Sequence, residues 1–133
     1  MITEQDVKLM QTAYGLLYEL ENSMRIYIKE KMEECYGIHW HHYAPRKVLK
    51  RPPSKAFESL LFSEYESYFR NYPNAFKNIP SELYTKLYQL YPIRNKVAHN
   101  HTLSLSEYEM LEQYAAFLIK CMDNEHHKSL VTS

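Results

Sequence analysis

The sequence predicts an all-α protein, an up-and-down bundle of helices with a long first helix and one or two short middle helices. Apolar residues recur three and four positions apart over long stretches, which is the period of an amphipathic helix. Only two of the 133 residues are glycine, which argues against a turn-rich β protein and excludes a glycine-rich phosphate loop. We expect one domain over residues 1–133, a length that allows a substantial core.

The first helix is expected over residues 3–36. Thr3 offers an N-cap with Asp6 in the first turn, and Gly37 supplies a C-terminal stop. Glu21 falls on the apolar stripe of this helix, and two partners are open to it: Arg25, one turn further along, or Arg94 from another helix. The apolar members of the stripe are Val7, Met10, Tyr14, Leu17, Met24 and Ile28.

Residues 38–56 are expected to form an irregular basic loop, since no acidic residue occurs between Glu34 and Glu58. Its cations either contact RNA phosphates or belong to an ordinary solvated loop. Trp40 and Tyr43 are available there to stack on unpaired bases. Three nearby histidines have no cysteine or carboxylate beside them, so we expect no metal site. The candidate RNA-binding cations are Arg46, Lys47, Lys50 and Arg51.

Residues 57–71 predict one or two short helices, with Ser63 as a candidate N-cap between them. Pro80 suits the first position of a helix over residues 80–99. Pro92 falls inside that helix and favours a kink, which either re-aims the residues after it or is simply tolerated.

The last helix is expected over residues 105–123. It begins at the sequence Ser104-x-x-Glu107, which is a capping box. Its apolar residues keep a strict three-four register, and they are Tyr108, Leu111, Ala115, Leu118 and Met122.

Polar residues interrupt the apolar stripe of the 80–99 helix. Arg94 lies on the stripe, where a cation is costly unless a polar or anionic group meets it. Asn95 and His99 are one helical turn apart and project from a neighbouring face. An arginine and a histidine near a helix end are more often a capping pair or a solvated edge than a functional site. The stripe itself contains Leu83, Leu87, Leu90 and Val97.

Arg94-Asn95, three further residues and then His99 resemble the signature of the HEPN superfamily, small all-helical domains often found in RNA-cleaving toxins and defence proteins. The run of residues 98–107 agrees with this pattern, and residues 17–28 resemble the long first helix of Abi-like HEPN proteins. The resemblance covers nearly the whole chain and implies a HEPN-like fold.

The resemblance implies a metal-independent endoribonuclease that cleaves RNA next to a 2′-hydroxyl, needs no cofactor, and works as a homodimer with a composite site. Arg94, Asn95 and His99 would be catalytic, with Glu21 and His101 in supporting roles. Such a protein would be a toxin or an anti-phage effector, with an antitoxin or another protein as a partner.

Two other functions stay open: a non-catalytic HEPN module that binds RNA, a nucleotide or a partner protein, and a plain helical dimer.

Lys96 joins the candidate RNA-binding cations. The formal net charge is zero, so the chain lacks the global positive field of non-specific nucleic-acid binders. We expect a cytoplasmic protein that does not enter a membrane, since the longest apolar run, residues 115–119, is far too short to span a bilayer.

Overall fold

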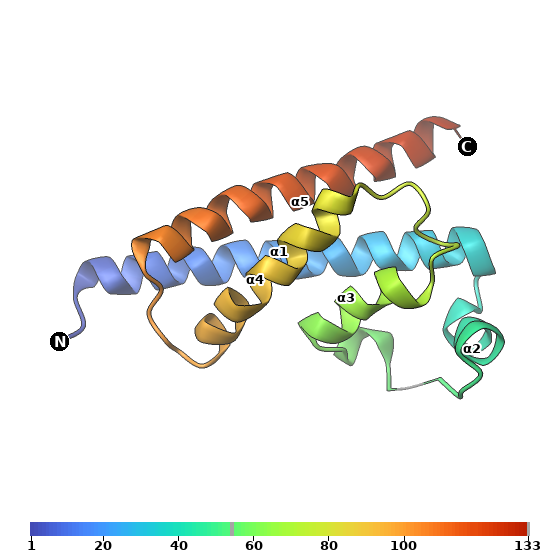
Figure 1. The fold of residues 1–133 in the computed structure, drawn as a ribbon, viewed down its shortest axis with the longest axis horizontal. Helices are drawn as coiled ribbons and strands as arrows, with labels where there is room; N and C mark the ends of the chain where they lie inside the picture. The colour runs from blue at the N-terminus through green and yellow to red at the C-terminus, as the bar shows by residue number, and fades with distance from the viewer. Residues whose placement is uncertain (54, 133) are drawn as a thin grey trace. The chain divides into compact units, whose positions relative to one another are not determined.

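The structure, a computed structural model, describes residues 1–53 and 55–132, with the backbone alone for residues 125–132. In this part of the chain all regular secondary structure is helical, so the all-α prediction is confirmed (Figure 1). The elements are α1 (Glu4–Tyr36), α2 (Trp40–Ala44), a π-helical turn η1 (Pro45–Leu49), a 3-10 turn η2 (Phe57–Ser59), α3 (Phe62–Asn71), α4 (Ser81–Ala98) and α5 (Leu105–Thr132).

Contacts divide the chain into two compact units. The first unit combines Met1–Ser23 with Ser81–Ser133, and the second covers Met24–Pro80. Helix α1 contributes its first turns to the first unit and its remaining turns to the second. The expectation of one domain over residues 1–133 stays a prediction.

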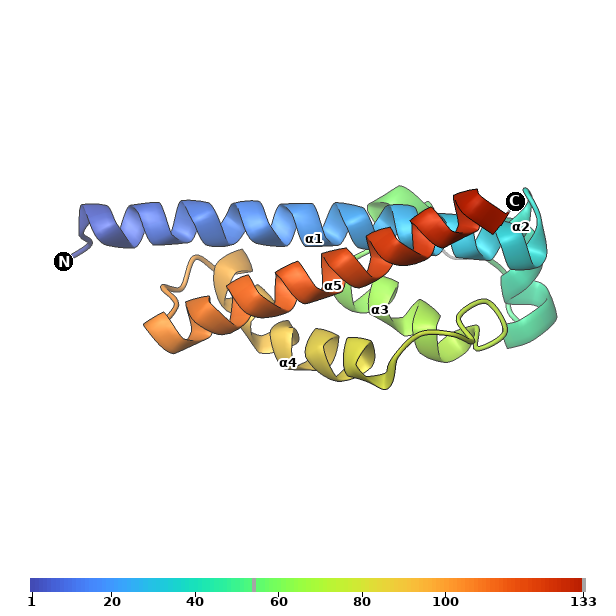
Figure 2. The same ribbon diagram turned by 90° about the horizontal axis from the view of Figure 1, so that it is seen from above.

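The first unit is built on α4 and α5, which lie side by side (Figures 1 and 2). The apolar stripes predicted for both helices are confirmed except at Tyr108, which is half-buried. Helix α4 continues through Pro92 without interruption. The buried side chains of the two helices are Leu83, Leu87, Leu90, Ile93 and Val97 from α4, and Leu111, Ala115, Leu118 and Met122 from α5.

The stripe predicted for α1 is correct in its middle and wrong at its start. Leu17 is buried as expected, but Val7 and Tyr14 are exposed. The predicted stripe repeats every seven residues, whereas a straight α-helix has 3.6 residues per turn and rotates by about 20° per heptad. Residues on a strict seven-residue repeat therefore do not all lie on the buried face of α1. Ala13 and Leu20 lie on the buried face instead.

The starts of α1 and α5 and the end of α1 follow the sequence signals, whereas α5 continues to Thr132, nine residues beyond the predicted end at residue 123. The Thr3 backbone N–H donates to the Asp6 carboxylate at 3.1 Å, and the Asp6 N–H donates back to the Thr3 hydroxyl at 3.1 Å. Gly37 follows α1 with a φ of 89°, a left-handed conformation that suits glycine. The predicted N-cap at Ser63 is wrong, because α3 already begins at Phe62.

The prediction of an irregular loop over residues 38–56 is wrong for residues 40–49, because α2 and η1 occupy them. Trp40 and Ala44 are one turn apart in this segment and are both buried. The expectation that Trp40 could stack on bases is therefore wrong, because its side chain is only 5% exposed. Two short elements of five residues each carry too little periodicity to be recognised in the sequence.

Aromatic rings fill the core of the Met24–Pro80 unit. Trp40 meets Phe57 edge to face, with ring centroids 5.0 Å apart, and Phe57 meets Tyr65 and Tyr68 in the same way at 5.1 and 5.6 Å. Such pairs add about 0.5–1.5 kcal/mol each beyond the burial of their surface. The cluster joins α2, η2 and α3.

The hydroxyl of Tyr65 is the polar centre of this unit. It donates to the backbone carbonyl of Phe57 at 2.5 Å and accepts a hydrogen bond from Arg25 Nε at 2.9 Å. Tyr65 has no exposed surface, so both bonds lie away from competing water. One side chain of α3 thereby holds η2 and the second part of α1.

Tyr65→Phe tests this bridge. The substitution keeps the ring and leaves the Phe57 carbonyl without its donor, so we expect a loss of about 1–3 kcal/mol in the free energy of unfolding. Urea denaturation of both proteins would measure it. Tyr18→Phe is the matched control because the Tyr18 side chain is 62% exposed. Equal midpoints for the Tyr65 variant and the wild type would contradict the role given to the hydroxyl.

Candidate functional site

The motif residues lie at the C-terminal end of α4 and in the turn that follows it. Arg94 and Asn95 are half-buried in the helix, whereas His99 and His101 are exposed beyond its last residue. The His99 backbone N–H donates to the Asn95 carbonyl at 3.0 Å, so these two residues stand on successive turns as the spacing predicts.

A Schellman motif ends α4. Asn100 has a φ of 61°, and its N–H donates to the Val97 carbonyl at 3.1 Å. The next N–H, from His101, donates to the Lys96 carbonyl at 2.7 Å. His99 therefore takes the C-cap position with its imidazole exposed, and Asn100 is the residue type that best replaces glycine at the left-handed position.

Arg94 lines a hollow of about 230 Å³ in the first unit, between the first part of α1 and the end of α4. Glu21 lies on the opposite wall, so the structure brings Glu21 and Arg94 to one place. No ion pair joins them among the described residues. Arg25, the other partner predicted for Glu21, donates to the Tyr65 hydroxyl. The imidazole of His99 is not part of the wall.

Exposed aromatic rings border the same hollow. Tyr14 and Tyr18 both line it, and their rings stack with centroids 6.5 Å apart and an angle of 28° between planes. The guanidinium of Arg94 offers several N–H donors in one plane, which suits a phosphate, and flat rings suit unpaired bases. Glu21 opposes the positive charge, so the hollow is close to neutral overall.

Lys96 is engaged within the protein. Its Nζ lies 2.6 Å from a Glu107 carboxylate oxygen, while the other oxygen accepts the Ser104 N–H at 2.9 Å. The Glu107 N–H donates to the Ser104 hydroxyl at 3.2 Å, which confirms the predicted capping box. The pair ties the end of α4 to the start of α5. Its charge compensation makes Lys96 less available for RNA than the sequence suggested.

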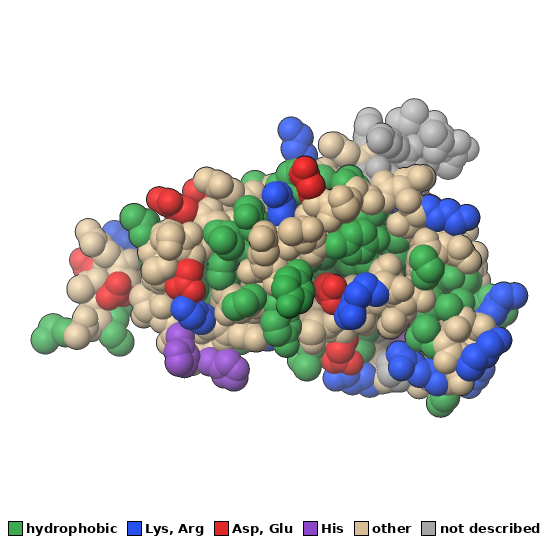
Figure 3. All heavy atoms as spheres, in the orientation of Figure 1, with side chains coloured by type: hydrophobic (Ala, Val, Ile, Leu, Met, Phe, Trp, Pro, Cys, Tyr) green, Lys and Arg blue, Asp and Glu red, His purple; other side chains and the backbone are tan. Residues whose placement is uncertain are grey.

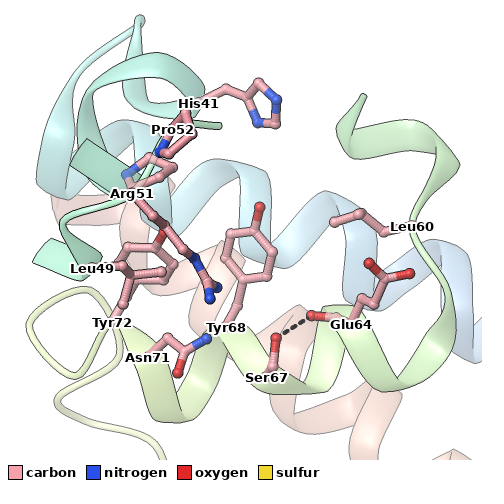
Figure 4. Close-up of a pocket in the computed structure, with 11 residues that line it drawn as sticks. His41, Leu49, Arg51, Pro52, Leu60, Glu64, Ser67, Tyr68, Asn71 and Tyr72 are labelled. Carbon is pink, nitrogen blue, oxygen red and sulfur yellow. Dashed lines mark hydrogen bonds between the residues drawn. The ribbon is translucent and has the colours of Figure 1, made fainter. Parts of the chain in front are cut away.

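The predicted basic residues are exposed in the second unit, where Figure 3 shows Lys and Arg side chains over the α2 end of the molecule. They lie in different surroundings. Arg46 donates to the His42 carbonyl at 3.1 Å, and Lys47 Nζ lies 5.5 Å from the centre of the Tyr43 ring. Arg51 instead lines a cavity beside α3 (Figure 4).

This cavity is the feature that the sequence did not reveal. Its walls come from residues 41–52 and 60–72, two stretches that carry no shared motif. The sequence signal for it is Arg51, but the neighbouring cations in the sequence indicate a basic loop and not a cavity.

Two kinds of feature are absent from the part of the chain that the structure describes. No three His, Cys, Asp or Glu side chains lie close enough together to hold a metal ion. None of the described helices combines the length and the apolar character needed to cross a bilayer.

Glu107→Gln tests the ion pair at the end of α4. Lys96, followed by the Ser104 N–H, lowers the pKa of Glu107 in the folded protein. The carboxylate therefore stabilises the fold above the ordinary glutamate pKa, and this contribution is lost as the pH falls through the lowered pKa. We expect a loss of about 0.5–1 kcal/mol at pH 7 in the variant, shrinking to nothing in acid.

Urea unfolding of both proteins between neutral and acidic pH would measure this difference. Glu109→Gln, on an exposed position of α5, is the matched control. A difference between wild type and the Glu107 variant that does not change with pH would show that the charge of Glu107 contributes nothing.

No protein-family model, no curated protein and no solved structure matches this chain. The likeness to HEPN proteins therefore rests on the motif residues of α4 and on their sequence context.

Proposed function

We propose that this protein is a metal-independent endoribonuclease of the HEPN type, which acts as a homodimer in the role of a toxin or an anti-phage effector. The observation that carries the proposal is the hollow at the end of α4. A half-buried arginine without an ion pair among the described residues faces this hollow, and an exposed histidine follows five residues later.

The reaction needs proton transfer at two oxygens and a positive charge between them. The RNA 2′-oxygen attacks the adjacent phosphorus and gives its proton to a base, while the bond from phosphorus to the 5′-oxygen breaks and that oxygen takes a proton from an acid. The products are a 2′,3′-cyclic phosphate and a 5′-hydroxyl. Arg94 would stabilise the charge on the phosphorane-like transition state.

His99 would exchange the protons, because an imidazole is an effective acid or base near neutral pH. Each chain has one motif histidine, so a second copy would supply the other proton-transfer group. Asn95, one turn before His99, would hold the imidazole or a phosphate oxygen. Glu21 would orient the Arg94 guanidinium from across the hollow, and His101 would be auxiliary.

Exposed apolar residues on the first unit support the proposed homodimer. Protein interfaces are enriched in tyrosine, and four of the exposed large side chains described in this unit are tyrosines. The exposed ones in this unit include Val7, Tyr14, Tyr18, Tyr88, Tyr91 and Leu105. RNA outside the site would contact Arg46, Lys47 and Lys50 of the second unit.

Arg94→Ala and His99→Ala test the chemistry. We expect each to lower the cleavage rate of a labelled single-stranded RNA by about 100-fold or more, because each removes a group that acts in the transition state. Wild-type cleavage should persist in EDTA and leave a cyclic phosphate, detected by mass spectrometry. Arg70→Ala and His42→Ala remove the same side-chain types from exposed positions of the second unit and serve as controls.

Intact RNA after incubation with the folded wild-type protein, together with equal growth of cells that express wild type and both variants, would remove the ribonuclease proposal. Circular dichroism would establish that the variants fold. Activity that needs an added divalent cation would overturn the metal-independent mechanism.

Dilution tests the composite site. If two chains supply the proton-transfer groups, cleavage per chain should fall on dilution as the dimer dissociates, in parallel with the mass measured by analytical ultracentrifugation. Constant activity per chain across a measured change from dimer to monomer would show that one chain holds a complete site.

A second candidate function is a non-catalytic HEPN module that binds RNA or a partner protein. The specific observation in its favour is that residues of the motif segment also stabilise the fold. Asn100 ends α4 in a left-handed conformation, and Lys96 pairs with Glu107. On this proposal the Arg94 and His99 variants would change binding or stability and no RNA would be cut.

A further inference from the structure

The Met24–Pro80 unit contains a cavity of about 450 Å³ between the η1 segment and α3 (Figure 4). The size lies in the range of small-molecule sites, about 300–1,000 Å³, and is far more than a single oxyanion needs. One wall comes from His41 and residues 45–52, and the other from Leu60 and a partly buried face of α3.

A cation without a counter-charge faces this cavity. Figure 4 shows the Arg51 guanidinium pointing toward α3, beside the ring of Tyr68 and the side chain of Asn71. Arg51 has no ion pair within the described residues. A guanidinium and an amide that converge on one space provide several N–H donors for an anionic group.

The acidic side chain on the wall does not cancel this charge. The Glu64 carboxylate lies 3.0 Å from Lys55 Nζ and accepts the Leu61 backbone N–H at 3.1 Å. These bonds lower the pKa of Glu64, with the Leu61 N–H as the larger cause. Its negative charge is thus already matched by Lys55, and Arg51 leaves the cavity with a net positive charge.

Neutral polar groups complete the lining. Burial raises the pKa of the Tyr68 and Tyr72 phenols, so both hydroxyls stay protonated at neutral pH and do not repel an anion. The Nδ1 atom of His41 is buried and has no hydrogen-bond partner among the described residues. A buried polar atom of this kind is expected to have a partner, such as water or a ligand.

The remaining wall is apolar and partly flat. Leu49, Pro52 and Leu60 line the cavity together with the ring of Tyr68, which stands at its centre in Figure 4. A ligand that fills this space therefore needs an anionic end for Arg51 and Asn71 and a flat, largely apolar body for the other wall.

From this combination we propose that the cavity binds a nucleotide through its terminal phosphate, which Arg51 and Asn71 hold while the base packs against Leu49, Leu60 and Tyr68. The site lies in the unit that does not contain Arg94 or His99, so it does not rest on the ribonuclease proposal. A terminal phosphate is supplied either by a free mononucleotide or by the 5′ end of an RNA strand.

Calorimetric titration of the full chain with adenosine 5′-monophosphate tests the site. We expect saturable binding at one site per chain, and Arg51→Ala should weaken it by about tenfold or more because a charge-assisted contact to the phosphate is lost. Arg70→Ala is the matched control, since it removes an exposed arginine of α3 that does not line the cavity. Its affinity should equal that of the wild type.

Three outcomes would overturn the proposal. The first is no saturable binding of the nucleotide by the folded wild-type protein. The second is equal weakening by Arg51→Ala and Arg70→Ala, which would indicate a diffuse basic surface. The third is inorganic phosphate binding as tightly as the nucleotide, which would show that the apolar wall contributes nothing.

A competition experiment separates the two sources of the phosphate. Trinucleotides with a 5′-phosphate and with a 5′-hydroxyl would be titrated against the protein loaded with the mononucleotide. Displacement by the phosphorylated strand alone supports an RNA end as the ligand, and displacement by neither supports a free nucleotide. Equal displacement by both strands would mean that the terminal phosphate is not recognised, which contradicts the proposal. A ribonuclease test that fails leaves each of these readouts unchanged.

Discussion

A guanidinium that is withdrawn from water loses hydration, and this cost must be met by polar partners nearby. Arg25 and Arg94 meet it in different ways. Arg25 donates to the Tyr65 hydroxyl, which is itself bonded to the Phe57 carbonyl, so this cation is part of a closed polar network in an aromatic core. Arg94 is half-buried beside an open hollow with Glu21 on the far wall. The first arrangement is structural, whereas the second leaves donors directed at solvent or at a ligand.

The end of α4 combines the requirements of the fold with those of a site. Ending a helix leaves carbonyl groups to be satisfied, and the Schellman bonds of Asn100 and His101 satisfy two of them. The same turn places the His99 side chain at the surface, one turn beyond Asn95. The motif therefore has a structural use whatever its chemistry, and a resemblance in this stretch alone does not distinguish a nuclease from a binding module.

The two hollows differ in electrostatics. The hollow at Arg94 holds an opposing carboxylate from Glu21, so a bound phosphate would need a second cation or a rearranged Glu21. In the cavity beside α3, the carboxylate of Glu64 is already paired with Lys55, and the charge of Arg51 is not offset. On the proposed mechanism a second chain would supply the further groups needed at Arg94, whereas the residues that line the Arg51 cavity all come from one chain.

The helical class, the N-cap at Thr3, the capping box at Ser104, the stop at Gly37 and the buried stripes of α4 and α5 follow from the sequence alone, because these depend on residues a few positions apart. It misassigned Val7 and Tyr14, since a seven-residue repeat drifts around a straight helix. It also misjudged Trp40, and it gave no sign of the cavity at Arg51, because the surroundings of these two residues come from η2 and α3. Which cations find partners and which face a hollow is seen only in the folded chain, because burial and pairing are set by residues distant in sequence.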